Sequence, residues 1–107
     1  MAKIAVVEDN DAMREQLCGF IAQYARESGR QLDVTAFADG AEIVDPYRPG
    51  FDIIFLDIEM PTLGGMPTAE RIRQVDPDVV LVFVTNMAQY AIRGYEVDAL
   101  DLSLIHI

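Results

Sequence analysis

The apolar residues of this chain form short segments with two different periodicities. Continuous runs rich in Val, Ile and Leu are typical of strands buried on both faces of a parallel sheet. Apolar residues spaced three or four positions apart are typical of amphipathic helices, and Gly or Pro closes most segments. The pattern predicts strands over residues 3–7, 32–37, 53–56, 79–84 and 97–104, and helices over 11–27, 41–45, 87–95 and between Pro67 and Pro77.

Strands and helices therefore alternate along the whole chain. Such alternation predicts an α/β fold in which right-handed crossovers put helices on both faces of a five-stranded parallel sheet. A chain of 107 residues has the length of one domain with a core of its own. No internal repeat, low-complexity tract or linker interrupts the pattern, so residues 1–107 are interpreted as a single unit.

Composition narrows the possible partners and the compartment. The net charge of −10 argues against direct binding to nucleic acid or to an anionic membrane, since both need clustered Lys and Arg. No apolar run approaches the ~20 residues of a membrane span, and no signal peptide is recognised, so a cytoplasmic location is expected. Cys18 is the single cysteine, which excludes an internal disulfide, and its spacing with Leu17 and Ile21 favours a core thiol.

Acidic residues follow two of the predicted strands. Asp57 ends the strand 53–56, and Glu8 and Asp9 follow the first strand. The carboxyl ends of parallel strands share one edge of the sheet, where ligands of open α/β sheets bind. For Asp57 alone, a loop-capping role and a functional role are both open, and Asp9 could simply cap the first helix.

A cluster of three carboxylates at this edge must hold protons or bind a cation. Each ionised pair at ~4 Å costs about 4 kcal/mol at an effective dielectric constant near 20. Oxygen ligands without His or Cys select a hard cation, and Mg²⁺ fits because it takes one or two carboxylates plus water. The cluster, formed by Glu8, Asp9 and Asp57, is therefore interpreted as a magnesium site.

The same acids disfavour a direct phosphate site. A phosphate-binding loop after the first strand needs free N–H groups, whereas Glu8 to Asp11 is acidic and would repel phosphate unless a metal ion lay between. With such a metal, Asp57 could attack a phosphoryl group as a carboxylate nucleophile. Thr85, which ends the fourth strand, could hydrogen-bond a phosphoryl oxygen or could simply end that strand.

In their order along the chain, these features resemble the receiver domain of two-component response regulators. The matching features are Glu8-Asp9, the signature Asp57-Ile-Glu-Met-Pro61 with Gly65 after it, and Thr85 at the end of strand four. The stretch 85–101 is similar to receivers that precede a LytTR-type DNA-binding domain, which implies transcription regulation. The resemblance implies a flavodoxin-like doubly wound sheet with strand order 2-1-3-4-5.

The resemblance also assigns roles to individual residues. Asp57 would accept a phosphoryl group from the phosphohistidine of a sensor histidine kinase. Asp9 would bind Mg²⁺ directly, Glu8 directly or through water, and the Glu59 backbone carbonyl would complete the site with Asp57. Asn86 would lie beside the phosphoryl group and influence its lifetime. No enzymatic activity is implied beyond self-phosphorylation from small phosphodonors and autodephosphorylation.

The C-terminal residues depart from the family pattern. The family's aromatic switch residue and its Lys-Pro pair would fall on Leu102, Ile105 and His106, and no lysine follows Lys3. The fifth helix is expected to be missing, which would leave apolar surface exposed near strands one and five. Exposed apolar patches of this kind bind partners, so a homodimer is predicted.

Two other functions remain open from the sequence. A receiver-like module without the lysine could act in docking or dimerisation regardless of phosphorylation. A haloacid-dehalogenase-like phosphatase would have a second acid two residues after its nucleophile, as Glu59 is to Asp57. Such phosphatases carry the nucleophile after their first strand and need a catalytic lysine, which disfavours this alternative.

Overall fold

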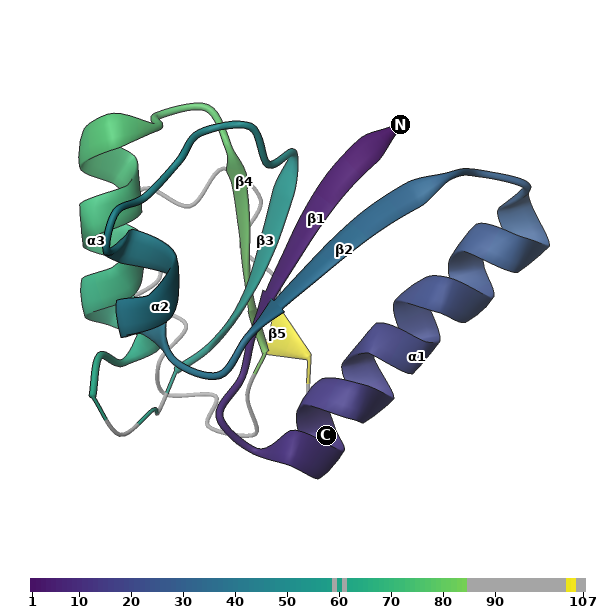
Figure 1. Cartoon of the computed structure of the whole chain (residues 1–107), viewed down its shortest axis with the longest axis horizontal. Helices are drawn as coiled ribbons and strands as arrows, with labels where there is room; N and C mark the ends of the chain where they lie inside the picture. Colours follow the sequence, from purple (N-terminus) through teal and green to yellow (C-terminus); the bar gives the residue numbers. More distant parts are fainter. Residues whose placement is uncertain (59, 61, 85–103, 106–107) are drawn as a thin grey trace.

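Five strands and three helices make up the described part of the chain, which in this computed structural model comprises residues 1–58, 60, 62–84 and 104–105. In chain order the elements are β1 (Ala2–Val7), α1 (Asp11–Ser28), β2 (Leu32–Phe37), α2 (Gly40–Val44), β3 (Ile53–Asp57), α3 (Gly65–Val75), β4 (Val80–Val84) and β5 (Leu104–Ile105) (Figure 1). All neighbouring strands pair in parallel, in the order β2-β1-β3-β4-β5. The predicted flavodoxin-like sheet with order 2-1-3-4-5 is confirmed.

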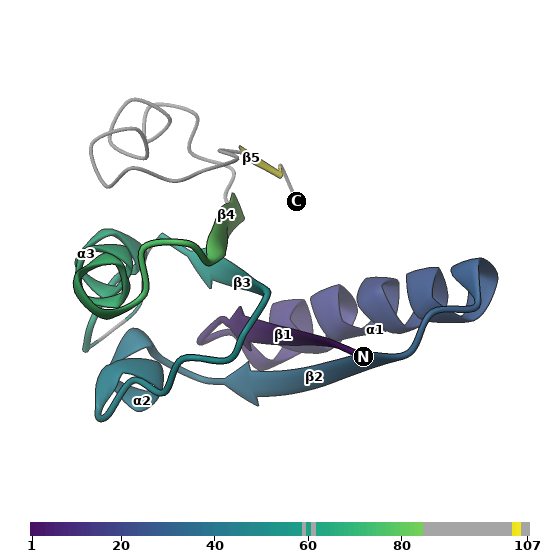
Figure 2. The ribbon, with the colours of Figure 1, turned by 90° about the horizontal axis from the view of Figure 1, so that it is seen from above.

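Helices cover both faces of the sheet, as predicted. Figure 2 shows α1 on one face and α2 and α3 on the other. Successive residues of β1 alternate between the two sides: Ala5 and Val7 belong to the apolar cluster shared with α2 and α3, and Ile4 and Val6 to the cluster shared with α1. Because both faces are buried, the strand sequence is continuously apolar rather than alternating. Full burial of a Val or Ile side chain stabilises the fold by about 1.5–3 kcal/mol.

The ends of α1 are defined by two capping residues. The Asn10 side chain accepts a hydrogen bond from the Met13 N–H, and Gly29 ends the helix with a φ of +69°. A left-handed residue after the last turn is usually glycine, because it has no Cβ to clash. The alternative in which Asp9 merely caps this helix is therefore wrong: Asn10 is the N-cap, which leaves the Asp9 carboxylate available for another role.

The apolar pattern of α1 is broader than its contact with the sheet. Leu17 and Ile21 are buried, whereas Phe20 and Tyr24 are 58% and 55% exposed. Cys18 packs against the same cluster but is only half-buried, and desolvation raises the pKa of its thiol.

An apolar groove of about 480 Å³ lies between α1 and the sheet. It is lined by Leu17, Phe20, Ile21 and Tyr24 of α1, by Ala2, Ile4, Leu32, Ile53 and Phe55 of the strands, and by Arg30. Bare apolar surface was expected near strands one and five, and the groove lies over β1, β2 and β3.

Part of the predicted C-terminal half lies outside the described residues. The predicted helix over 87–95 and most of the predicted strand over 97–104 fall there. The described strand β5 pairs Leu104 with Phe83 and Ile105 with Val84 of β4. Within the residues that the structure describes, no helix is both long enough and apolar enough to cross a membrane.

Candidate metal centre

Three acids meet at the carboxyl edge of the sheet, at the ends of β1 and β3. Val7, the last residue of β1, pairs with Leu56 of β3, so the next residues of the two strands, Glu8 and Asp57, are neighbours. Glu8, Asp9 and Asp57 each offer a carboxylate oxygen, and these oxygens all lie within 4.8 Å of one another. The structure thus brings together the three side-chain acids that the sequence placed at one edge.

The environment of the cluster disfavours full ionisation of its carboxyl groups. Glu8 is only 3% exposed, and Asp57 is half-buried. Desolvation by burial raises the pKa of Glu8 to about 8, and hydrogen bonding with Asp57 and Asp9 adds to this, against an opposing hydrogen bond from the Asn10 N–H. Desolvation and the nearby Asp9 charge likewise raise the pKa of Asp57. With a pKa of about 8, the Glu8 carboxyl group retains its proton at neutral pH or gives it up to a cation.

The donor set fits a hard divalent cation. Every ligand side chain in the cluster offers oxygen, and neither His nor Cys is among the three grouped residues. Carboxylate oxygens suit Mg²⁺, which binds through one or two of them and keeps several water molecules. A bound cation would also offset the repulsion between the carboxylates that otherwise favours their protonation. The burial of the cluster and its oxygen ligands therefore both favour a divalent cation.

Arg14 holds the acidic loop from the first turn of α1. Its guanidinium donates to the Glu8 carbonyl oxygen at 2.9 Å and pairs with the Asp11 carboxylate. The sequence analysis did not assign Arg14 any role. Its position six residues after Glu8, in the first turn of the helix predicted from residue 11, could have suggested contact with the loop, but the direction of the side chain is not readable from the sequence.

Two glycines allow the chain to turn closely after Asp57. The Gly65 N–H donates to the Ile58 carbonyl at 2.8 Å, and a Cβ at Gly65 would overlap the Asp57 carbonyl oxygen. A Cβ at Gly64 would lie 2.9 Å from the Ile58 carbonyl oxygen, closer than real contacts allow. Gly65 thus packs against the backbone of Asp57, the candidate nucleophile, and Gly64 against that of Ile58, so neither position has room for a side chain.

Three predicted site residues lie outside the described part of the chain. They are Glu59, Thr85 and Asn86. Val84, which precedes Thr85, pairs with Asp57 across β3 and β4. The roles predicted for these three residues stay predictions.

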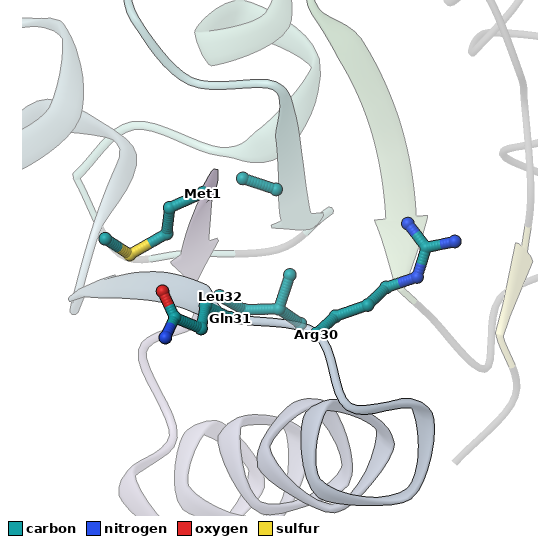
Figure 3. A pocket seen from close by; sticks show the side chains of 5 residues that line it. Met1, Arg30, Gln31 and Leu32 are labelled. Atoms are coloured by element: carbon teal, nitrogen blue, oxygen red, sulfur yellow. The ribbon is translucent and has the colours of Figure 1, made fainter.

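One concave surface feature lies away from the acids. A pocket of about 380 Å³ is lined by Met1, Ala2, Arg30, Gln31 and Leu32, at the opposite edge of the sheet. Figure 3 shows the Arg30 side chain extending away from Met1 and Gln31. This pocket has no cluster of convergent polar groups, so it does not compete with the acidic edge as the candidate site.

Comparisons with known proteins agree with this geometry. The family described as "Response regulator receiver domain" matches residues 4–103. The sensory transduction protein LytT of Bacillus cereus is 31% identical over 106 residues, which cover 97% of this chain and 41% of LytT. The chain thus spans less than half the length of this relative.

Solved structures show the same fold. The non-phosphorylated HemR receiver domain from Leptospira biflexa superposes with a TM-score of 0.81 at 28% identity, covering 99% of this chain and 82% of that one. The response regulator TrrA from Thermotoga maritima, determined in complex with Mg²⁺ and BeF, superposes with a TM-score of 0.80 at 23% identity, covering 100% and 87% of the two chains. The second likeness is evidence for the fold alone.

Proposed function

The chain belongs to the response regulator receiver domain family, and from this premise we propose that Asp57 is its phosphoacceptor. Receiver domains are phosphorylated by sensor histidine kinases, and the transfer proposed here is Mg²⁺-dependent. The observation that carries the proposal is the grouping of Glu8, Asp9 and Asp57 within 4.8 Å at the carboxyl edge of the sheet. TrrA, a protein of the same fold, was determined in complex with Mg²⁺ and BeF, and Mg²⁺ is the ion we propose for the acids of this chain.

Each acid of the cluster has a distinct proposed role. Asp9 and Asp57 bind the metal ion directly, Glu8 binds it directly or through water, and the Glu59 backbone carbonyl completes the set. Magnesium, when bound, neutralises the charge of the carboxylates and of an incoming phosphoryl group. A carboxylate oxygen of Asp57 then bonds to phosphorus while the phosphorus–nitrogen bond of the donor phosphohistidine breaks, and the departing nitrogen keeps the electron pair.

The phosphorylated state adds about −1.5 to −2 charge at this edge. Thr85 is proposed to hydrogen-bond a phosphoryl oxygen, and Asn86 to influence how long the aspartyl phosphate lasts. The output is proposed to be transcription regulation through a LytTR-type domain. Receiver domains are generally not enzymes, and self-phosphorylation from small phosphodonors and autodephosphorylation are the reactions proposed for this chain. A histidine-kinase donor also favours a cytoplasmic location.

Intact-mass analysis tests the phosphoacceptor assignment directly. Incubation with acetyl phosphate and Mg²⁺ is expected to add one phosphoryl group to the wild-type chain and none to Asp57→Asn. Asp33→Asn, a substitution at an exposed acid of β2, is the matched control and is expected to label like the wild type. Equal labelling of wild type and Asp57→Asn would remove Asp57 from this role.

We also propose that a second copy of the chain covers the apolar groove between α1 and the sheet. The face is self-complementary: the groove is apolar, and the half-exposed rings of Phe20 and Tyr24 stand on the helix at its border. A two-fold interface presents the same surface from both copies, so the rings of one copy can enter the groove of the other.

Sedimentation velocity at tens of micromolar tests this homodimer. Phe20→Glu is expected to shift the wild-type dimer to monomer. Val75→Glu is the control, because Val75 is equally exposed, at 56%, but lies on α3 on the opposite face. A monomeric wild type would refute the dimer and leave the phosphoacceptor assignment unaffected.

A further inference from the structure

One carboxylate outside the acidic cluster connects two elements beside it. Asp39 is the N-cap of α2, and its Oδ1 accepts hydrogen bonds from the Ala41 N–H at 2.9 Å and the Leu63 N–H at 2.9 Å. Its Oδ2 accepts a third, from the Thr62 N–H at 3.0 Å. Thr62 and Leu63 belong to the connection between Asp57 and α3, so Asp39 ties the end of β2 to the segment that follows the proposed phosphoacceptor.

The backbone next to Asp39 packs against the same connection. A Cβ at Gly40 would overlap the Thr68 hydroxyl and lie 2.5 Å from the Leu63 carbonyl oxygen. Thr68 is completely buried, and its hydroxyl donates to the Gly64 carbonyl at 2.7 Å. The sequence Asp39-Gly40 therefore provides both the acceptor for the connection and the space in which the connection lies.

Helix capping accounts for only one of these three hydrogen bonds. An N-cap needs one side-chain oxygen that accepts a backbone N–H of the first turn, and Ser or Asn serves as well as Asp. The other two hydrogen bonds come from residues more than twenty positions away in the chain. Desolvation opposes ionisation of Asp39, but hydrogen bonds from Ala41, Thr62 and Leu63 outweigh it and lower its pKa, so the carboxylate is charged at neutral pH.

We propose that Asp39 is a positioning residue for the phosphoacceptor site. By holding Thr62 and Leu63, it fixes the residues that lead into Gly65, whose backbone packs against that of Asp57. Loss of the two long-range hydrogen bonds weakens Mg²⁺ binding and slows phosphorylation without removing any ligand. This inference rests on the proposed function, whose own test is the labelling of Asp57.

Three substitutions at Asp39 separate positioning from capping. Asp39→Ser keeps an oxygen for the Ala41 N–H but is too short to reach the connection, and Asp39→Ala loses all three hydrogen bonds. Asp39→Asn keeps Oδ1 but turns an amide toward the Thr62 N–H, which removes one bond. The matched control is Asp52→Ser: Asp52 accepts a backbone hydrogen bond from the Lys3 N–H at 2.8 Å, at the other end of β3.

Calorimetric titration with Mg²⁺ and the rate of labelling by acetyl phosphate measure the effect, below the melting temperature of each variant. Asp39→Ser and Asp39→Ala are expected to raise the Mg²⁺ dissociation constant about tenfold, the scale on which supporting hydrogen bonds act on metal sites, and to slow labelling. Asp39→Asn is expected to have a smaller effect, and Asp52→Ser none. Amide hydrogen exchange in Asp39→Ser is expected to quicken at Thr62 and Leu63 but not at Ala41.

Wild-type Mg²⁺ affinity in Asp39→Ser, together with unchanged exchange at Thr62 and Leu63, would overturn the inference and leave Asp39 as a helix cap. The result is distinguishable from a failure of the proposed function. If the wild type takes no phosphoryl group, the phosphoacceptor role fails, while Mg²⁺ affinity and amide exchange still decide whether Asp39 positions the connection.

Discussion

Burial of Glu8 makes the stability of the metal-free protein depend on pH in an unusual direction. Its pKa is raised from 4.5 to about 8, mainly by desolvation. Between these two values the folded state holds a proton that the unfolded state has released. The free energy of unfolding therefore falls as pH rises through this window, the reverse of the behaviour of a carboxylate whose pKa is lowered on folding.

The size of this effect follows from linkage. One proton retained by the folded state changes the free energy of unfolding by at most 1.36 kcal/mol per pH unit. Between pH 5.5 and 7.5 the metal-free protein is expected to lose up to about 2.7 kcal/mol, which for a domain of this size lowers the melting temperature by about 10 °C. Because Glu8 and Asp57 influence each other, the titration belongs to the acidic cluster and not to one residue.

Thermal melts in EDTA across this pH range measure the effect. They are best made in a His106→Ala background, because His106 is the single histidine of the chain and the ordinary pKa of a histidine side chain lies in this pH range. Glu8→Gln is expected to flatten the profile and to melt above the wild type at pH 7.5. Millimolar Mg²⁺ is expected to remove the decline in the wild type, because the cation binds the deprotonated cluster. A metal-free melting temperature that stays level or rises between pH 5.5 and 7.5 would refute the reasoning, as would an unchanged slope in Glu8→Gln.

Three further changes test the site and its scaffold. Asp9→Ala is expected to abolish the stabilisation by Mg²⁺ seen in thermal melts, which for the wild type at one hundred times the dissociation constant is about 2.7 kcal/mol; a full shift in the variant would exclude Asp9 as a ligand. Gly65→Ala is expected to lower the free energy of unfolding by about 1–3 kcal/mol, because the Asp57 carbonyl occupies the space of the added methyl. Urea titrations measure this loss. In the control Gly19→Ala, at a helix position where an added Cβ would have nothing within 4 Å, the free energy of unfolding is expected to rise by about 0.5–1 kcal/mol. Equal effects at the two glycines would contradict the packing described for Gly65. Ile72→Ala, at a fully buried position of α3, is expected to cost about 2–5 kcal/mol, and a loss below 1 kcal/mol would mean that the core there is not as described.

The sequence predicted the sheet because its strands are buried on both faces and its acids follow strand ends. Once strands 3–7 and 53–56 were taken as parallel neighbours, the meeting of Glu8 with Asp57 followed from topology alone. The one-residue shifts at the ends of β1, α1 and β4 reflect the usual ambiguity of element boundaries.

Long-range hydrogen bonding by side chains was not predictable in this way. A helix was predicted over 41–45, but the contacts of Asp39, just before it, with Thr62 and Leu63 depend on how two loops approach each other. Phe20 and Tyr24 follow the helical period, yet they extend past the surface that α1 covers. Periodicity identifies the apolar side of a helix, but not how much of that side has a neighbour.

The side chains of β1 alternate between the two buried faces of the sheet, and in the acidic pair that follows Glu8 is buried and Asp9 is exposed. The position of each residue along the strand therefore decides both which face of the sheet it packs on and which carboxyl group is buried. Inserting or deleting a single residue in this strand would turn Ala5 and Val7 toward the wrong layer and would also exchange which carboxyl group is desolvated. A change in the length of the first strand would therefore disturb the core and the acidic cluster together.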